Sequence, residues 1–142
     1  MFTKIFTKIF VALFAATAVL SAPVESAEKR ITHTGRATFY SPSVGIGACG
    51  WQNTDEELVV ALNAPQYALN ADHNCGQSVR ITNEQNGNQE IAKVVDLCPG
   101  CNDGDLDMSP ALFGALNNND FDQGVFPISW NFLPRDDTSS SN

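Results

Sequence analysis

The chain has 142 residues, of which 43% are hydrophobic and 17% charged, and its formal net charge at pH 7 is −8. Once terminal segments are set aside, about 110 residues form one domain, which buries only roughly two-thirds of its unfolded surface. The acidic balance and the lack of clustered Lys and Arg argue against nucleic acid and anionic lipid as partners, because binding phosphates needs such clusters.

The N-terminus has the pattern of a secretory signal peptide. Lys4 and Lys8 precede a run of apolar or small residues from Ile9 to Leu20, which is too short to span a bilayer and leads into further small residues. We expect a signal peptide over residues 1–27, and the dibasic pair Lys29–Arg30 leaves open a pro-segment to residue 30. The mature chain would be secreted, without a membrane segment. Removal of residues 1–30 would leave four basic and fourteen acidic residues.

The four cysteines are Cys49, Cys75, Cys98 and Cys101. An even number in a secreted chain indicates disulfides, but four cysteines allow three pairings and the residues alone do not choose among them. The Cys98–Cys101 spacing also occurs in redox dithiols, yet no helix is expected to begin at Cys98, and the acidic surroundings would raise the pKa of a thiol. A four-cysteine zinc site prefers two close pairs, and this chain has one. We therefore expect structural disulfides, no metal and no cofactor.

Short β-type runs alternate with Gly, Asn, Asp and Pro clusters along the chain. Strands are predicted at residues 36–40, 57–61, 78–82, 90–95 and 125–132. Asn86–Gly87 predicts a hairpin between the third and fourth of them. This pattern predicts a small all-β domain over residues 31–134, closed into a barrel because closure removes exposed strand edges.

Only two segments have helical character. Residues 64–69 predict one turn, and residues 109–118 a longer helix with Ser109 as N-cap and Pro110 at its first position. The polar segment 135–142 is expected to be a disordered tail.

Aspartates follow the fourth predicted strand and precede the capped helix. If the intervening loop folds back, Asp96 and Asp107 line one groove, where a coupled pair of carboxyls holds one proton and suits sugar hydroxyls and acetal oxygens. Alternatively, Asp96 caps a turn and the aspartates from 103 to 107 are solvated, and spacing alone favours this interpretation. The same aspartates match the start of an EF-hand loop, but Met108 and Gly114 stand where that loop needs Gly and Glu.

Five segments occur in an order that is specific as a set: GRATFY (35–40), GACGW (47–51), NCGQSVRIT (74–82), VVDLCPGC (94–101) and DLDMSPALF (105–113). Together they resemble the double-psi β-barrel domain of expansins, loosenin-like fungal proteins and the barwin and RlpA relatives. The resemblance implies a six-stranded double-psi β-barrel with one or two short helices, stapled by disulfides. It also implies an open groove across one face and an extracellular location at the cell wall.

The resemblance further implies the roles of individual residues. Asp107 and Asp96 fall on acidic positions of the family groove, so we expect Asp107 to act at a glycan oxygen and Asp96 to orient it. Thr38 and Tyr40 fall on groove-lining positions. Trp51 would offer a second aromatic face to sugar rings.

Three further features follow from the same comparison. Asp105 stands where the family has a histidine and completes the expected substrate-binding set. The family pattern pairs Cys49 with Cys75 and Cys98 with Cys101. After Leu133 only a polar tail follows in place of the second expansin domain, so we expect weak affinity for polysaccharide.

One departure concerns hydrolysis. In related glycoside hydrolases an aspartate follows the Thr-x-Tyr segment and acts as the base, whereas here Ser41-Pro42-Ser43 follow Tyr40. Inverting hydrolysis needs an acid and a base roughly 6.5–9.5 Å apart. The missing base argues against conventional hydrolase activity.

These observations lead to one main hypothesis and two alternatives. We expect a secreted monomer that binds glucan, cellulose or chitin of the cell wall and loosens it without hydrolysis. A second hypothesis is an inhibitor of papain-type cysteine proteases or another protein-binding module, because some small secreted double-psi barrels resemble this chain. The third, riboflavin-aldehyde formation, ranks below these because the sequence has no flavin-binding fingerprint and no redox-metal ligand set.

Overall fold

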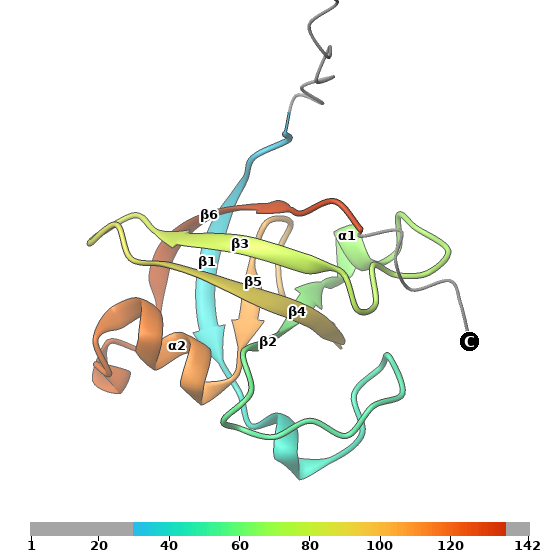
Figure 1. The fold of residues 1–142 in the computed structure, drawn as a ribbon, viewed down its shortest axis with the longest axis horizontal. Coiled ribbons are helices and arrows are strands. Elements are labelled where there is room, and N and C mark those ends of the chain that lie inside the picture. Colours follow the sequence, from blue (N-terminus) through green and yellow to red (C-terminus); the bar gives the residue numbers. More distant parts are fainter. Residues whose placement is uncertain (1–29, 136–142) are drawn as a thin grey trace, which may run out of the picture.

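The computed structural model describes residues 30–135, and the six strands of this range close into a barrel in the order β1-β5-β2-β4-β3-β6 (Figure 1). The expected signal peptide, the Lys29–Arg30 processing site and residues 136–142 of the expected tail lie at least partly outside this range. The strands are β1 His33–Phe39, β2 Val59–Asn63, β3 Ser78–Asn83, β4 Gln89–Cys98, β5 Leu106–Met108 and β6 Phe126–Phe132. The predicted six-stranded barrel is confirmed.

Two strand pairs are parallel, β1 with β5 and β2 with β4, and the remaining neighbours are antiparallel. The predicted hairpin joins β3 to β4, and Gly87 takes the positive φ of 78° that its turn requires. Strand β5 is absent from the sequence-based prediction, although it lies between β1 and β2 and completes the barrel.

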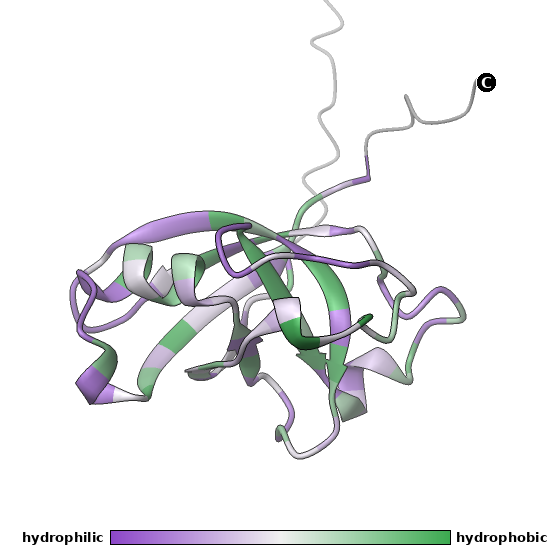
Figure 2. Ribbon diagram, turned by 90° about the horizontal axis from the view of Figure 1, so that it is seen from below, coloured by the Kyte–Doolittle hydropathy of each residue, from purple (hydrophilic) through white to green (hydrophobic). Residues whose placement is uncertain are grey.

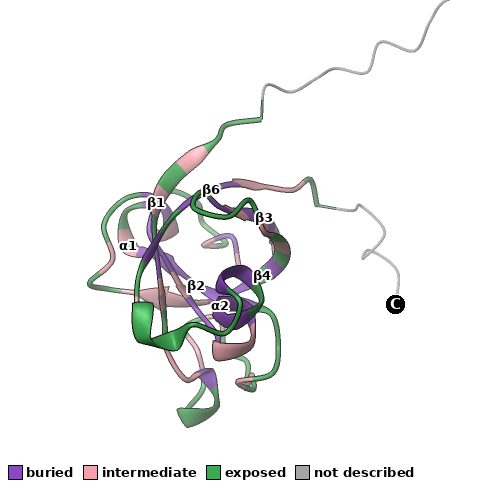
Figure 3. Cartoon of the chain, turned by 90° about the vertical axis from the view of Figure 1, so that its left-hand side faces the viewer, coloured by how far each residue is buried: buried purple, intermediate pink, exposed green. Residues whose placement is uncertain are grey.

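The core consists of side chains that alternate along the strands and point into the barrel. On β3, Val79 and Ile81 are buried while their neighbours are partly exposed. The largest buried side chains are Trp130, Phe113 and Phe126. Apolar residues accordingly concentrate on the barrel strands (Figure 2), and helix α2 is largely buried against them (Figure 3).

Two short α-helices and two 3₁₀ turns connect the strands: α1 Ala64–Tyr67, α2 Pro110–Asn117, η1 Pro42–Val44 and η2 Phe121–Gln123. Helix α2 begins as predicted, because the Ser109 hydroxyl accepts a hydrogen bond from the Leu112 N–H and Pro110 occupies the first turn. Its C-cap is Asn118, whose φ of 59° is left-handed. No helix among residues 30–135 is long and apolar enough to cross a membrane.

Both disulfides have the pairing that the resemblance implied. Cys49 and Cys75 are 26 residues apart in sequence, and their disulfide joins two loops. Cys98–Cys101 closes a short loop at the end of β4. In the chain-entropy model, the cross-link over the longer loop stabilises the fold more.

Candidate functional site

Four strands place Thr38, Asp107, Ala61 and Asp96 side by side in one row across the sheet, which we call the acidic row. Thr38 on β1 pairs with Asp107 on β5, Asp107 pairs with Ala61 on β2, and Ala61 pairs with Asp96 on β4. Residues paired across neighbouring strands point to the same face of a sheet. Two strand spacings separate the aspartates, about 10 Å between Cα atoms.

The face that carries the acidic row is the outer one. On β5, Leu106 and Met108 are fully buried in the core, so Asp107 between them points outward. Ala61 has the smallest side chain of the row, so little bulk separates the two carboxyl groups. The structure therefore brings Asp96 and Asp107 to one face.

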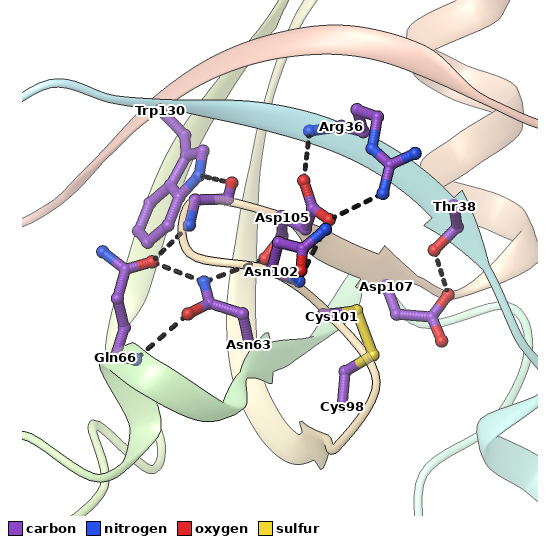
Figure 4. A network of polar contacts seen from close by, with 11 residues as sticks. Arg36, Thr38, Asn63, Gln66, Cys98, Cys101, Asn102, Asp105, Asp107 and Trp130 are labelled. Carbon is purple, nitrogen blue, oxygen red and sulfur yellow. Dashed lines mark hydrogen bonds and ion pairs between the residues drawn. A yellow bond between two sulfur atoms is a disulfide. The ribbon is translucent and has the colours of Figure 1, made fainter.

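Asp107 is half-buried, and the Thr38 hydroxyl donates a 2.9 Å hydrogen bond to its Oδ1 (Figure 4). Burial raises the pKa of Asp107, because a desolvated carboxylate is costly. The Thr38 hydrogen bond works in the opposite direction, and the negative charge of Asp96 adds to the rise in the pKa. Asp107 thus holds its proton to a higher pH than an exposed aspartate.

Asp96 is oriented by backbone. Its Oδ1 accepts hydrogen bonds from the N–H groups of Ala48 at 2.7 Å and Leu97 at 2.8 Å. Gly47 lies directly against it, since a Cβ at that position would stand 3.1 Å from the Asp96 Cγ and 2.7 Å from the Val95 carbonyl oxygen. Within residues 30–135, both of these bonds end on Oδ1 and none ends on Oδ2.

Tyr40 lies near both aspartates of the acidic row. Its hydroxyl is buried and makes no hydrogen bond of ordinary geometry with other described residues. Burial raises the pKa of Tyr40. The negative charges of Asp96 and, to a smaller extent, Asp107 raise this pKa further. The phenol therefore stays protonated and is a potential hydrogen-bond donor.

Asp105 lies two residues before Asp107 and has a different role from its neighbour. It is 7% exposed, and its carboxylate accepts hydrogen bonds from the Arg36 N–H at 2.9 Å, the Arg36 guanidinium at 3.2 Å and the Asn102 N–H at 3.2 Å (Figure 4). Both oxygens are engaged within the protein. The structure thus places this predicted substrate-binding residue in the hydrogen bonds that join β1 to the loop before β5.

Trp51, the other predicted aromatic, lies outside the acidic row and is 44% exposed. Its carbonyl oxygen accepts a 3.1 Å hydrogen bond from Gly47, the residue that lies against Asp96. Its ring rests on Gly76, where a Cβ would stand 3.3 Å from the Trp51 Cη2 atom.

The contact that Asp55 makes was not predicted from the sequence. Its carboxylate accepts hydrogen bonds from the Ser41 and Ser43 hydroxyls at 2.8 Å. These serines belong to the segment after Tyr40, where related glycoside hydrolases have the aspartate that acts as the base. These bonds, that of Ser41 first, hold the pKa of Asp55 below its usual range. Asp55 is not among the groups that shift the pKa of Asp107. A serine pair followed across sequence by an isolated aspartate is too common a pattern to predict such a contact.

Comparison with known proteins gives a consistent result. Residues 48–133 match the model of the Barwin family. The chain is 40% identical over 103 residues to Allergen Asp f 7 of Aspergillus fumigatus, which covers 69% of this chain and 36% of the relative. The chain spans 36% to 59% of the lengths of the first curated relatives it matches.

Two solved structures share the barrel at 32% identity and a TM-score of 0.62. One is a mutant of a Clavibacter michiganensis expansin in complex with cellohexaose, matched over 79% of this chain and 59% of that one. The other is a Streptomyces papain inhibitor, matched over 73% of this chain and 96% of that one.

Proposed function

The chain belongs to the Barwin family, and on that premise we propose that it is a secreted protein that binds cell-wall polysaccharide along its acidic row and loosens it without hydrolysis. The observation that carries the proposal is the row itself, in which Thr38, Asp107 and Asp96 share one outer face of the barrel. A glycan presents hydroxyl and acetal oxygens, so its site needs both donors and acceptors.

The row supplies both kinds of group. Asp107, whose pKa is raised by burial, donates a hydrogen bond from its protonated carboxyl to a glycan oxygen while the Thr38 hydroxyl fixes its other oxygen. Asp96, oriented by two backbone N–H groups, offers Oδ2 to a glycan hydroxyl. Each new bond to the protein replaces one between neighbouring glycan chains, which is how binding loosens the wall.

Two observations support loosening rather than cleavage. The segment after Tyr40 contains no aspartate, and Asp55, which reaches that segment, is bound by Ser41 and Ser43. The expansin relative supports a glycan as the ligand, because a mutant of it was crystallised with cellohexaose.

Asp107→Asn tests the proposal. Asn keeps the size of the side chain and an acceptor for Thr38, but its amide N–H is a weaker hydrogen-bond donor than a carboxylic acid O–H, so wall loosening should fall sharply while the melting temperature changes little. Asp103→Asn is the matched control, because Asp103 is exposed on the preceding loop and makes no hydrogen bond within the described part of the chain. Loosening is measured as extension of loaded wall strips, binding as pull-down on cellulose, chitin and xylan.

Two results would contradict the proposal. Equal loosening by wild type and Asp107→Asn would remove Asp107 from the mechanism. Release of reducing sugar by the wild type and not by Asp107→Asn would replace loosening with hydrolysis.

A second candidate function, inhibition of a papain-type cysteine protease, is favoured by the loop before Cys49. Val44 and Ile46 are 85% and 72% exposed on this loop. The Cys49–Cys75 disulfide and the Ser41–Asp55 hydrogen bonds hold it in place. A rigid loop loses little entropy when it enters a protease cleft, and the papain inhibitor shares this barrel over 96% of its length.

A tight-binding assay against papain separates the two candidates. If the loop is inhibitory, the double variant Val44→Ser/Ile46→Ser should lose inhibition and Asp107→Asn should keep it. Absence of inhibition by the wild type would exclude this second candidate.

A further inference from the structure

A pocket of about 450 Å³ opens beside the acidic row, and we call it the Trp51 pocket. Its lining includes Trp51, Asn53, Glu57, Leu58, Val59 and Lys93. None of these residues takes part in the hydrogen bonds of Asp96 and Asp107 described above. Trp51 is linked to Asp96 only through the loop that it ends, because Ala48 on that loop donates to the Asp96 carboxylate.

The strand register fixes where this pocket lies relative to the row. Val59 and Lys93 pair across β2 and β4, and Val59 precedes Ala61 of the row by two residues. Two residues advance about 6.6 Å along a strand and return to the same face. The pocket therefore continues the face of the acidic row by one pleat along β2. On β4 the step from Lys93 to Asp96 is three residues, because the register shift adds Val95 between them.

The loop from Gly47 to Trp51 connects the two places physically. Gly47 lies against the Asp96 carboxyl and donates its N–H to the Trp51 carbonyl oxygen at 3.1 Å. The Cys49–Cys75 disulfide ties this loop to Gly76, on which the indole ring rests. Trp51 is thus held in place before any ligand arrives, and part of its ring stays exposed.

The polar groups of the pocket are balanced in charge. Within residues 30–135, the Lys93 ammonium makes no ion pair and no hydrogen bond. Glu57 brings the opposite charge, and its carboxylate also accepts from the Thr54 N–H at 2.5 Å. A donor, an acceptor and an aromatic face together suit a pyranose ring, whose hydroxyls both donate and accept and whose C–H face is apolar.

We propose that the Trp51 pocket is a second sugar subsite, which takes an uncharged pyranose ring of the same glycan chain that lies across the acidic row. This inference rests on the proposed function. The ligand is an uncharged sugar because a uronate would add negative charge beside Glu57 and Asp96, which one lysine does not offset.

The test uses cellohexaose and the fluorescence of the protein. The chain has two tryptophans, and Trp130 is 2% exposed, so acrylamide quenching reports mainly on Trp51. Cellohexaose should protect Trp51 from acrylamide. Calorimetry should show that Trp51→Ala and Lys93→Gln weaken cellohexaose binding by roughly five- to tenfold.

Two control variants separate the subsite from general effects. Trp51→Phe keeps an aromatic face and should retain most of the affinity. Arg80→Gln removes a cation that also makes no ion pair among the described residues but does not line the pocket, and should bind as wild type. Unchanged melting temperatures would show that all variants fold.

Three outcomes overturn the inference in distinguishable ways. If cellohexaose binds but leaves Trp51 unprotected, with all variants alike, the subsite fails and the proposed function stands. If a glucuronate-substituted xylo-oligosaccharide binds more tightly than the unsubstituted one, and Lys93→Gln removes the difference, the pocket takes charged sugars instead. If no glycan binds, in solution or in pull-down, the proposed function fails together with the subsite.

Discussion

Thr38→Val should raise the pKa of Asp107 further. Burial already raises the pKa of this carboxyl, and the 2.9 Å hydrogen bond from Thr38 opposes that rise. A hydrogen bond to a charged group contributes about 1.5–3 kcal/mol. Solvent screening at a half-buried site reduces this to about 1–1.5 kcal/mol. Losing the bond should therefore raise the pKa of Asp107, because only the charged carboxylate gains from it.

The stability of Thr38→Val should therefore depend on pH. A carboxyl whose pKa is higher in the folded state contributes stability that is fully present below the unfolded pKa, about 3.9, and is lost as the pH rises through the folded pKa. The variant should match wild type below about pH 4 and be about 1–1.5 kcal/mol less stable at pH 7. Loosening that needs protonated Asp107 should extend to higher pH.

The assay is a carbon-detected NMR titration of the Asp107 carboxyl, together with urea unfolding at two pH values. Thr34→Val is the matched control, because Thr34 is exposed on the same strand and its hydroxyl makes no hydrogen bond within the described residues. An unchanged or lowered pKa of Asp107 in Thr38→Val would refute the role given to this hydrogen bond.

Two further predictions concern the support of the site. Gly47→Ala should lower the free energy of unfolding by about 1–3 kcal/mol, because a Cβ there would crowd Asp96. Gly45→Ala is the control and should be neutral, because a Cβ at that position meets nothing within 4 Å. Equal melting temperatures of the two variants would contradict this prediction. Removing Cys49–Cys75 by double alanine substitution should cost about 3–4 kcal/mol, against about 2 kcal/mol for the other disulfide, whose loop is much shorter. Urea unfolding measures both losses, and an equal loss would show that loop length does not decide them.

Local patterns predicted the elements that local residues specify. The Asn86–Gly87 turn and the Ser109 cap depend on residues a few positions apart, so the β3–β4 hairpin and helix α2 are as expected. Strand β5 is three residues long and lies in an acidic stretch, and it exists because β1 and β2 pair with it from distant parts of the chain. Such pairing leaves no local trace.

The same limit applies to the candidate site. The resemblance pointed to Asp96 and Asp107, but spacing favoured solvated loop charges, and only the register across β5, β2 and β4 brings them to one face. Asp105 has the same chemistry as Asp107, and its engagement by Arg36 follows from packing. The sequence therefore pointed to these acids without distinguishing Asp105, which Arg36 holds, from the two that lie on the outer face.

The register of β2 and β4 shifts between Val60 and Ala61, so β4 has one extra residue, Val95, opposite this point. If the pairing continued without this shift, Asp96 would stand opposite Leu62 and face the hydrophobic interior. The extra residue also leaves the Val95 carbonyl oxygen to accept a 3.2 Å hydrogen bond from the Cys49 N–H. Straightening β4 would therefore abolish the site even if every amino acid type were retained. Among homologues that keep this chemistry, alignments should hence show no gaps here, while the surface loops vary freely in length.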